Sequence, residues 1–368
     1  MTKLRRGAGT GLLAKNAWRL PTKMPDLVKE HESRGRYILL KDGTNIFVRD
    51  QQHSNHDKDA TVIVMVHGVP ASSFLYRKLF EPLLLMPKEG DGSGAYRVIA
   101  MDLPGLGLSG KPLDRDYSWP AMADALAEIM EHDALGLFSK MDDPGSNNQK
   151  KRTCNNKIHL VFHDIGGPIA TLYAAKHARQ HNIVSMTAMD TLLDVANFTP
   201  PFPMFFFPMP LIGKIAISTF TPFVFRHFMY LRGVQDMDRC DHDEAVAWVW
   251  LLKHKRGAKS FAKIMKSFPK GKSKQVLTQQ IQQGLGQSND GNEKTTTTTT
   301  NIPMQIIWAQ DEVAIPYSQC QYLQHKFLVQ PQDVHKVPGR HFYQLESATV
   351  MAVKMHQFLC RQALSSSR

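Results

Sequence analysis

Short apolar runs recur along this chain, and each run is followed by turn residues and then by a helical pattern. The runs cover residues 61–66, 97–101, 158–162, 183–189 and 304–309. Their hydrophobicity is nearly continuous instead of alternating, which is typical of strands that are covered on both faces of a sheet. Such strands, separated by helices, predict an α/β fold with a mostly parallel central sheet flanked by helices.

Local signals refine this prediction at three places. A hairpin is predicted at residues 36–50, with its turn at Asp42-Gly43. Ser118 is predicted to cap a helix that has Pro120 in its first turn, and residues 351–359 carry the apolar spacing of a last helix.

The strand pattern stops between residues 191 and 301. A chain of 368 residues has room for one domain with a large insertion. We therefore predict a core at residues 30–190 and 302–368, and a helical cap at 191–301 that ends in a disordered, Thr-rich insertion at 284–301. Residues 141–157 are predicted to be a second disordered insertion, and residues 1–29 a basic, flexible segment.

The composition excludes several classes of protein. With 42% hydrophobic and 21% charged residues, the chain is neither wholly disordered nor a coiled coil. The 4 cysteines are widely scattered, so neither a disulfide nor a zinc site is expected. Four prolines, Lys214 and Arg226 interrupt the most apolar stretch, residues 202–230, so no integral membrane span is predicted.

The formal net charge of +12 is concentrated in two segments. Residues 1–25 hold six Lys/Arg and no acid, so the segment is either a basic tail or an organelle transit peptide; the chain is accordingly expected in the cytoplasm or in an organelle. Residues 253–274 hold nine Lys/Arg and no acid. That pattern fits a solvated cap face better than a nucleic-acid partner, although association with a membrane surface stays open, as does the oligomeric state.

The run from Ile158 to Pro168 combines a strand, a tight turn and the start of a helix, with Asp164 at the apex. A sharp turn of this kind lifts the apex side chain out of the sheet and points it at the helix N-terminus. There a carboxylate can attack an electrophilic carbon and form an ester that water cleaves. The alternative is that Asp164 only caps the following helix.

Two backbone N–H groups are predicted to lie beside this apex. Residues 66–70 end an earlier strand, where the N–H of Val69 can join that of Ile165 in binding a developing oxyanion. No Gly-x-Ser-x-Gly sequence occurs, which excludes an ordinary serine esterase.

Gly105, Gly107 and Gly110 have the spacing of a dinucleotide fingerprint, directly after a strand. No helix is predicted after them, because Lys111-Pro112 and a polar turn follow. A shaped loop is therefore favoured over a dinucleotide site.

In this order, the motifs resemble the α/β-hydrolase superfamily, in the branch with an aspartate nucleophile that includes haloalkane dehalogenases and epoxide hydrolases. The resemblance covers roughly residues 35–362 without the two polar insertions. It implies that His341 is the base that activates water. It also implies an acid that orients the histidine: Glu312 is favoured over its neighbour Asp311, and Asp190, at the end of the preceding strand, is the rival.

The resemblance implies an α/β-hydrolase fold whose cap covers the carboxyl end of the sheet. It also implies a hydrolase that forms an aspartyl ester with a mainly apolar small molecule of the epoxide or haloalkane class, without a metal or an organic cofactor. Tyr230 is a predicted proton donor from the cap, and Phe206 is among the cap phenylalanines predicted to wall the substrate pocket.

Several positions depart from the family pattern. Dehalogenases hold the leaving halide with a Trp and often an Asn, where this chain has Ile165 and Val69. Phe162 stands where the apex turn prefers a small residue, which predicts looser packing or a different local path. Ala309, Glu312 and Arg340 also differ. These departures leave open a catalytically silent binding or scaffold protein with a hydrolase-like fold.

Overall fold

The computed structural model describes residues 20–53, 56–87, 94–138, 154–201, 204–285 and 302–366. The strands are β1 (Gly35–Leu39), β2 (Asn45–Gln52), β3 (His56–Val66), β4 (Gly94–Met101), β5 (Ile158–Asp164), β6 (Ile183–Thr191), β7 (Met304–Ala309) and β8 (Val334–Val337). The helices are α2 (Asp26–Ser33), α3 (Arg77–Leu84), α4 (Trp119–Met130), α5 (Gly166–His177), α6 (Pro210–Ser218), α7 (Pro222–Phe228), α8 (His242–Lys253), α9 (Gly257–Lys266), α10 (Lys272–Leu285), α11 (Tyr317–Lys326) and α12 (Ala348–Ser366).

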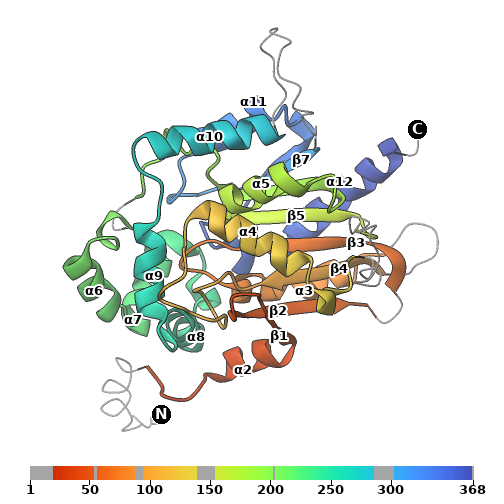
Figure 1. Cartoon of the computed structure of the whole chain (residues 1–368). Coiled ribbons are helices and arrows are strands. Elements are labelled where there is room, and N and C mark those ends of the chain that lie inside the picture. Colours follow the sequence, from red (N-terminus) through yellow and green to blue (C-terminus); the bar gives the residue numbers. More distant parts are fainter. Residues whose placement is uncertain are drawn as a thin grey trace, which may run out of the picture.

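The strands form one eight-stranded sheet in the order β1-β2-β4-β3-β5-β6-β7-β8. The hairpin β1-β2 is antiparallel and so is the pairing of β2 with β4, whereas the remaining pairs are parallel. Helices lie on both sides of the sheet, and further helices cover one end of its strands (Figure 1). The predicted α/β architecture, mostly parallel with a helical insertion, is confirmed.

Strand β3 illustrates why its sequence is apolar without alternation. Val62, Val64 and Val66 face the core beneath α4 and α5, while Ile63 and Met65 face the core beneath α3 and α12. Since successive side chains of a strand point to opposite faces, a sheet covered on both sides requires apolar residues at every position. The five predicted runs are β3 to β7 in the structure.

The other local predictions are also confirmed, with one strand missed. The hairpin turns between β1 and β2, and the Ser118 hydroxyl accepts the Ala121 N–H at 3.4 Å at the start of α4. Strand β8 was not predicted, because His335 and Lys336 interrupt its apolar pattern. As an edge strand, it needs less apolar surface than the central strands.

The insertion between β6 and β7 holds α6 to α10. Helix α7 packs against α8 and α6 against α9, whereas α10 packs along α5 of the core (Figure 1). On α9, Phe261, Ile264 and Met265 are buried, so its lysines lie on the opposite, outer face. Among the described helices, none combines the length and the hydropathy that crossing a bilayer requires.

The predicted flexible N-terminal segment and the predicted Thr-rich insertion each overlap the end of an ordered helix. Helix α2 begins at Asp26 and buries Val28, and α10 extends to Leu285. Residues 1–19, 139–153 and 286–301, which include most of the predicted flexible segment and insertions, lie outside the described residues.

Candidate active site

Asp164 ends β5, and α5 begins two residues later, at Gly166. Its φ of 52° lies in the left-handed region, which costs a non-glycine residue about 1–3 kcal/mol and persists only where the surrounding structure holds it. A Cβ at Gly166 would lie 2.4 Å from the Val66 carbonyl oxygen, and one at Gly167 would lie 1.9 Å from Thr191 Oγ1. The two glycines therefore let α5 approach the sheet closely enough to hold this strained turn.

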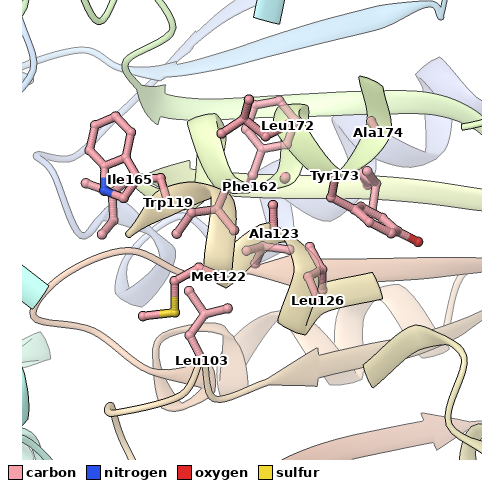
Figure 2. Packing of buried hydrophobic residues seen from close by; sticks show 14 of the residues in the cluster. Leu103, Trp119, Met122, Ala123, Leu126, Phe162, Ile165, Leu172, Tyr173 and Ala174 are labelled. Carbon is pink, nitrogen blue, oxygen red and sulfur yellow. The ribbon is translucent and has the colours of Figure 1, made fainter. Parts of the chain in front are cut away.

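Phe162 was expected to bring either looser packing or a different local path near this turn, and its burial argues against the looser packing. Its side chain is completely buried in the core beneath α4 and α5. Figure 2 shows its ring among Trp119, Ile165 and Leu172. The core beneath α4 and α5 therefore accommodates this large side chain.

Asp164 is 3% exposed, and backbone donors hold its carboxyl group. Its Oδ2 accepts the Val69 N–H at 2.8 Å, and the Ile165 N–H also bonds the carboxyl group. Burial raises the pKa of Asp164, and the charge of His341 and these two donors only partly oppose that effect. The N-cap residue of α5 is Ile165, whose side chain makes no cap hydrogen bond, so the Asp164 carboxyl meets the start of this helix through the Ile165 N–H.

His341 lies in the loop after β8 and contacts Glu312 directly. His341 Nδ1 and Glu312 Oε2 are 3.0 Å apart, and their side chains are 6% and 2% exposed. The remaining oxygen of Glu312 accepts the backbone N–H groups of Ala314 and Ile315. Asp311 instead faces outward, where it accepts a hydrogen bond from the Gln235 amide.

The two pKa shifts in this pair have opposite directions. Burial alone would raise the pKa of Glu312, but the charge and hydrogen bond of His341 outweigh it and hold that pKa well below its usual value. Burial alone would lower the pKa of His341, yet Glu312, followed by Asp164, raises it. Glu312 is therefore a charged partner that stabilises the imidazolium form of His341.

Asp190 is near this pair but is not the hydrogen-bond partner of the His341 ring. It is fully buried at the end of β6, and its Oδ1 accepts the Ala309 N–H at 2.8 Å. One ligand-type atom each of Asp190, His163 and His341 lies within 4.8 Å of the others. The structure thus brings both predicted acids to the same place and gives Glu312 the contact with the imidazole.

His163 was not singled out from the sequence, although it directly precedes the apex residue. Its Nε2 donates to the His341 carbonyl oxygen at 2.9 Å, and the two rings lie 4.5 Å apart. Burial holds the pKa of His163 well below its usual value, so the ring is neutral. A neutral ring here can fix the backbone of the His341 loop without adding a second positive charge.

The His341 loop is also joined to the cap through the helical turn Met229–Gly233. The Phe342 N–H donates to Gly233 O at 2.8 Å, and the His341 N–H donates to Arg232 O at 3.3 Å. Arg340, which departs from the family pattern, donates from its guanidinium to Tyr230 O. These bonds cross from the core to the cap, so the cap sets the position of the loop that carries the histidine.

A mostly apolar cavity lies between this loop and the cap. Asp164, His341 and Val69 line it from the core, and apolar side chains of the cap, including Phe207, Phe220, Phe228 and Phe261, line it from above. The space into which the centre of a water molecule fits is about 50 Å³. Because one water needs about 10–15 Å³ by this measure, the cavity holds a few waters or a small molecule.

The two predicted pocket residues do not reach this cavity. Tyr230 is 54% exposed, and neither it nor Phe206 is among the described residues that line the cavity. The ring of Phe206 lies against Phe205, at a centroid distance of 4.2 Å. A cap side chain that was not predicted, Arg232, does line the cavity. Its sequence context offers no signal, since it lies in an irregular helical turn between α7 and α8.

Residues 63–353 match the model of the alpha/beta hydrolase family. The chain belongs to this family. Its predicted α/β-hydrolase fold is thereby confirmed. The predicted likeness to haloalkane dehalogenases and epoxide hydrolases is confirmed by a relative and by solved structures of both kinds.

Three relatives illustrate how distant the sequence matches are. The bovine (Bos taurus) mesoderm-specific transcript homolog protein is 29% identical over 161 residues, which are 43% of this chain and 39% of the relative. A haloalkane dehalogenase of Psychrobacter cryohalolentis is 30% identical over 26% of this chain and 29% of its own length. A cis-3-alkyl-4-alkyloxetan-2-one decarboxylase of Xanthomonas campestris is 31% identical over 33% of this chain and 34% of its own. The matches thus span well under half of each relative.

Solved structures match over nearly the whole chain. The haloalkane dehalogenase DbeA of Bradyrhizobium elkani superposes with a TM-score of 0.62, at 17% identity, over 90% of this chain and 99% of its own. The epoxide hydrolase CorEH superposes with a TM-score of 0.60, at 16% identity, over 89% and 98%. At these identities the likeness shows the shared fold, and the activity has to be argued from the site.

Proposed function

We propose that this protein is a hydrolase that forms an aspartyl ester with a small, mainly apolar molecule carrying an epoxide or a halogen. One observation carries the proposal: the Asp164 carboxyl, held by the Val69 N–H at 2.8 Å, lines the same apolar cavity as His341, whose Nδ1 is held by Glu312 at 3.0 Å. A nucleophile, a base and an acid that orients the base are the parts that ester formation and hydrolysis require.

In the first step, Asp164 Oδ1 attacks the electrophilic carbon. A C–O bond forms and the C–O bond of the epoxide or the C–halogen bond breaks, with its electron pair going to the leaving atom. An epoxide oxygen then takes a proton from water, while a halogen leaves as the halide ion. Because Val69 holds Oδ2, the other oxygen of the carboxylate is the one available for attack.

In the second step, water attacks the carboxyl carbon of the ester, and His341 Nε2 takes the proton. Glu312 stabilises the resulting imidazolium through the Nδ1 contact. Negative charge develops on Oδ2, towards which the Val69 N–H already points at 2.8 Å. The C–O bond to the former substrate breaks and the imidazolium returns its proton to the alcohol oxygen, which leaves Asp164 as a carboxylic acid. The carboxylate is restored when this acid gives its proton to the hydroxide formed in the first step for an epoxide, or to water for a haloalkane.

The leaving atom faces the cap, where we infer a role for Arg232. Among the described residues that line the cavity, Arg232 is the one with a permanent positive charge. Its Nη1 donates to Val313 O at 3.0 Å, beside the cavity residue Ala314. A guanidinium can stabilise a departing oxyanion or halide, which the apolar Ile165 side chain cannot. Arg232→Gln is expected to lower the rate of ester formation and to leave ester hydrolysis less affected.

The test uses the whole protein and oxygen-18 water with a panel of an epoxide, a bromoalkane and an oxetan-2-one. In a single turnover, the product oxygen comes from Asp164, so the label appears in the peptide that contains Asp164 and enters product only in later turnovers. Mass spectrometry of that peptide reads the label, and Asp164→Asn is the matched control. Absence of label and product with every substrate contradicts the proposal and favours the silent binding protein.

A further inference from the structure

Two acids lie side by side beneath the candidate active site. Asp190 is at the end of β6, and Glu312 follows the end of the neighbouring strand β7, which pairs with β6 in parallel. Asp190 is fully buried, and the Glu312 side chain is 2% exposed. Two buried carboxylates in contact cannot both be ionised at an acceptable cost, so one of them holds a proton.

The hydrogen-bond donors around the two carboxyl groups indicate which of them holds the proton. Glu312 accepts from Ala314 and Ile315 with one oxygen and faces His341 with the other, as an ionised carboxylate does. Asp190 accepts one N–H, from Ala309, and no described residue donates to its Oδ2. Both oxygens of Glu312 thus have donors, whereas Asp190 has one donor for its two oxygens. Asp190 is therefore the acid with too few donors to be ionised, and a contact between two carboxyl groups requires its O–H, because carboxylates can only accept.

Among the described residues around Asp190, His341 is the one group that could carry a positive charge near pH 7. Burial raises the pKa values of Cys320, from α11, and Tyr343, from the loop before α12, so both are neutral near pH 7. His163 is neutral for the same reason. The protonated form of His341 is held by Glu312. In line with this, burial and then the negative charge of Glu312 raise the pKa of Asp190 well above its usual value.

We infer that Asp190 is a neutral carboxylic acid whose O–H donates to Glu312 and so positions the carboxylate that orients His341. This inference rests on the proposed function, and it makes Asp190 a positioning residue instead of a second charged partner of the histidine. The φ of 29° at Asp190 agrees with this role, since a buried residue is kept in such a conformation where its side chain must reach a set point. The three side chains Asp190, Glu312 and His341 then share one negative charge, which lies on Glu312.

Substitution of each acid by its amide, and of Asp190 by alanine, distinguishes the roles of Asp190 and Glu312. Asp190→Ala removes the donor and should lower kcat for ester hydrolysis by about tenfold or more, whereas Asp190→Asn supplies an N–H in place of the O–H and should recover most of that loss. Glu312→Gln removes the charge and should lower kcat by about 10²–10⁴-fold without recovery. The opposite pattern, with Asp190→Asn inactive and Glu312→Gln active, would overturn the inference.

Asp102 provides a matched control for stability. It is also a fully buried acid, but its two oxygens accept the Ser73 and Leu108 N–H groups, both at 2.6 Å. Asp102→Asn therefore places an amide N–H against a backbone N–H and should lower Tm, while Asp190→Asn should leave Tm near that of the wild type. Equal losses of Tm in the two variants would contradict a neutral Asp190.

Two readouts do not depend on turnover. The infrared carbonyl band of a buried, protonated carboxylic acid should be present at pH 7 in the wild type and absent in Asp190→Asn. In NMR titrations, Glu312→Gln should lower the pKa of His341, and Asp190→Asn should not. If no substrate is turned over, the proposed function fails, but the infrared and NMR results still decide the state of Asp190. Absence of the band in the wild type overturns the inference.

Discussion

Gly68 lies directly against the carboxylate proposed to act as the nucleophile. A Cβ at this position would be 2.4 Å from Asp164 Oδ2 and 2.5 Å from Asp164 Cβ. These distances are about 1 Å shorter than ordinary van der Waals contact, so Gly68→Ala must push the carboxylate by roughly that amount. A displacement of about 1 Å can cost about 10²-fold in rate when the reacting atoms are otherwise aligned. We expect Gly68→Ala to lower kcat/KM for ester formation by about 10²-fold.

The assay measures ester formation in single turnovers, with a substrate identified by oxygen-18 labelling, and is normalised to the folded fraction. The backbone of Gly68 is not left-handed, so alanine adds no conformational strain of its own. Gly43→Ala is the control: its Cβ would meet no atom within 4 Å, but its φ of +81° makes alanine cost about 1–2 kcal/mol of stability. The control should lose stability and keep its activity per folded molecule. A folded Gly68→Ala variant with kcat/KM within about threefold of the wild type would refute the reasoning.

Three further predictions follow from the same geometry. Asp164→Asn should abolish ester formation and raise the free energy of unfolding at neutral pH. Since burial raises the folded-state pKa of Asp164 above 3.8, the wild type loses stability as the pH rises from there through the folded value. In urea unfolding, the free energy of unfolding of Asp164→Asn should exceed that of the wild type at pH values above the folded-state pKa of Asp164. An equal excess below pH 3.8 would contradict the raised pKa. The rate of ester hydrolysis should rise with pH, because His341 must be neutral to accept a proton from water. The inflection of this profile should lie above pH 6.5, because Glu312 raises the pKa of His341. Stopped-flow pH profiles should move to lower pH in Glu312→Gln, and an unchanged inflection would argue against the pair. Phe162→Ala should cost about 3–5 kcal/mol of stability in urea unfolding, since the side chain is completely buried, and a loss below about 1 kcal/mol would show that it is loosely packed.

The fold and part of the site follow from signals that are local in the sequence. Apolar runs without alternation identified β3 to β7, because residues covered on both faces of a sheet must all be apolar. The strand-turn-helix run with two glycines identified Asp164 as the apex residue, since only this composition permits the close approach of α5. Strand β8 was not predicted, because an edge strand can be polar and then lacks the apolar run.

The sequence by itself determined which elements form and which residues stand at their ends, because periodicity, caps and tight turns depend on neighbours along the chain. Only the tertiary structure placed Glu312, and not Asp190, against the imidazole of His341, since the two acids stand at the ends of neighbouring strands and the contact depends on how the chain folds around them. It also put Arg232 at the cavity and Tyr230 at the surface. Such positions depend on how the cap packs on the sheet, and that packing joins segments about 100 residues apart, as in the bond from Arg340 to Tyr230.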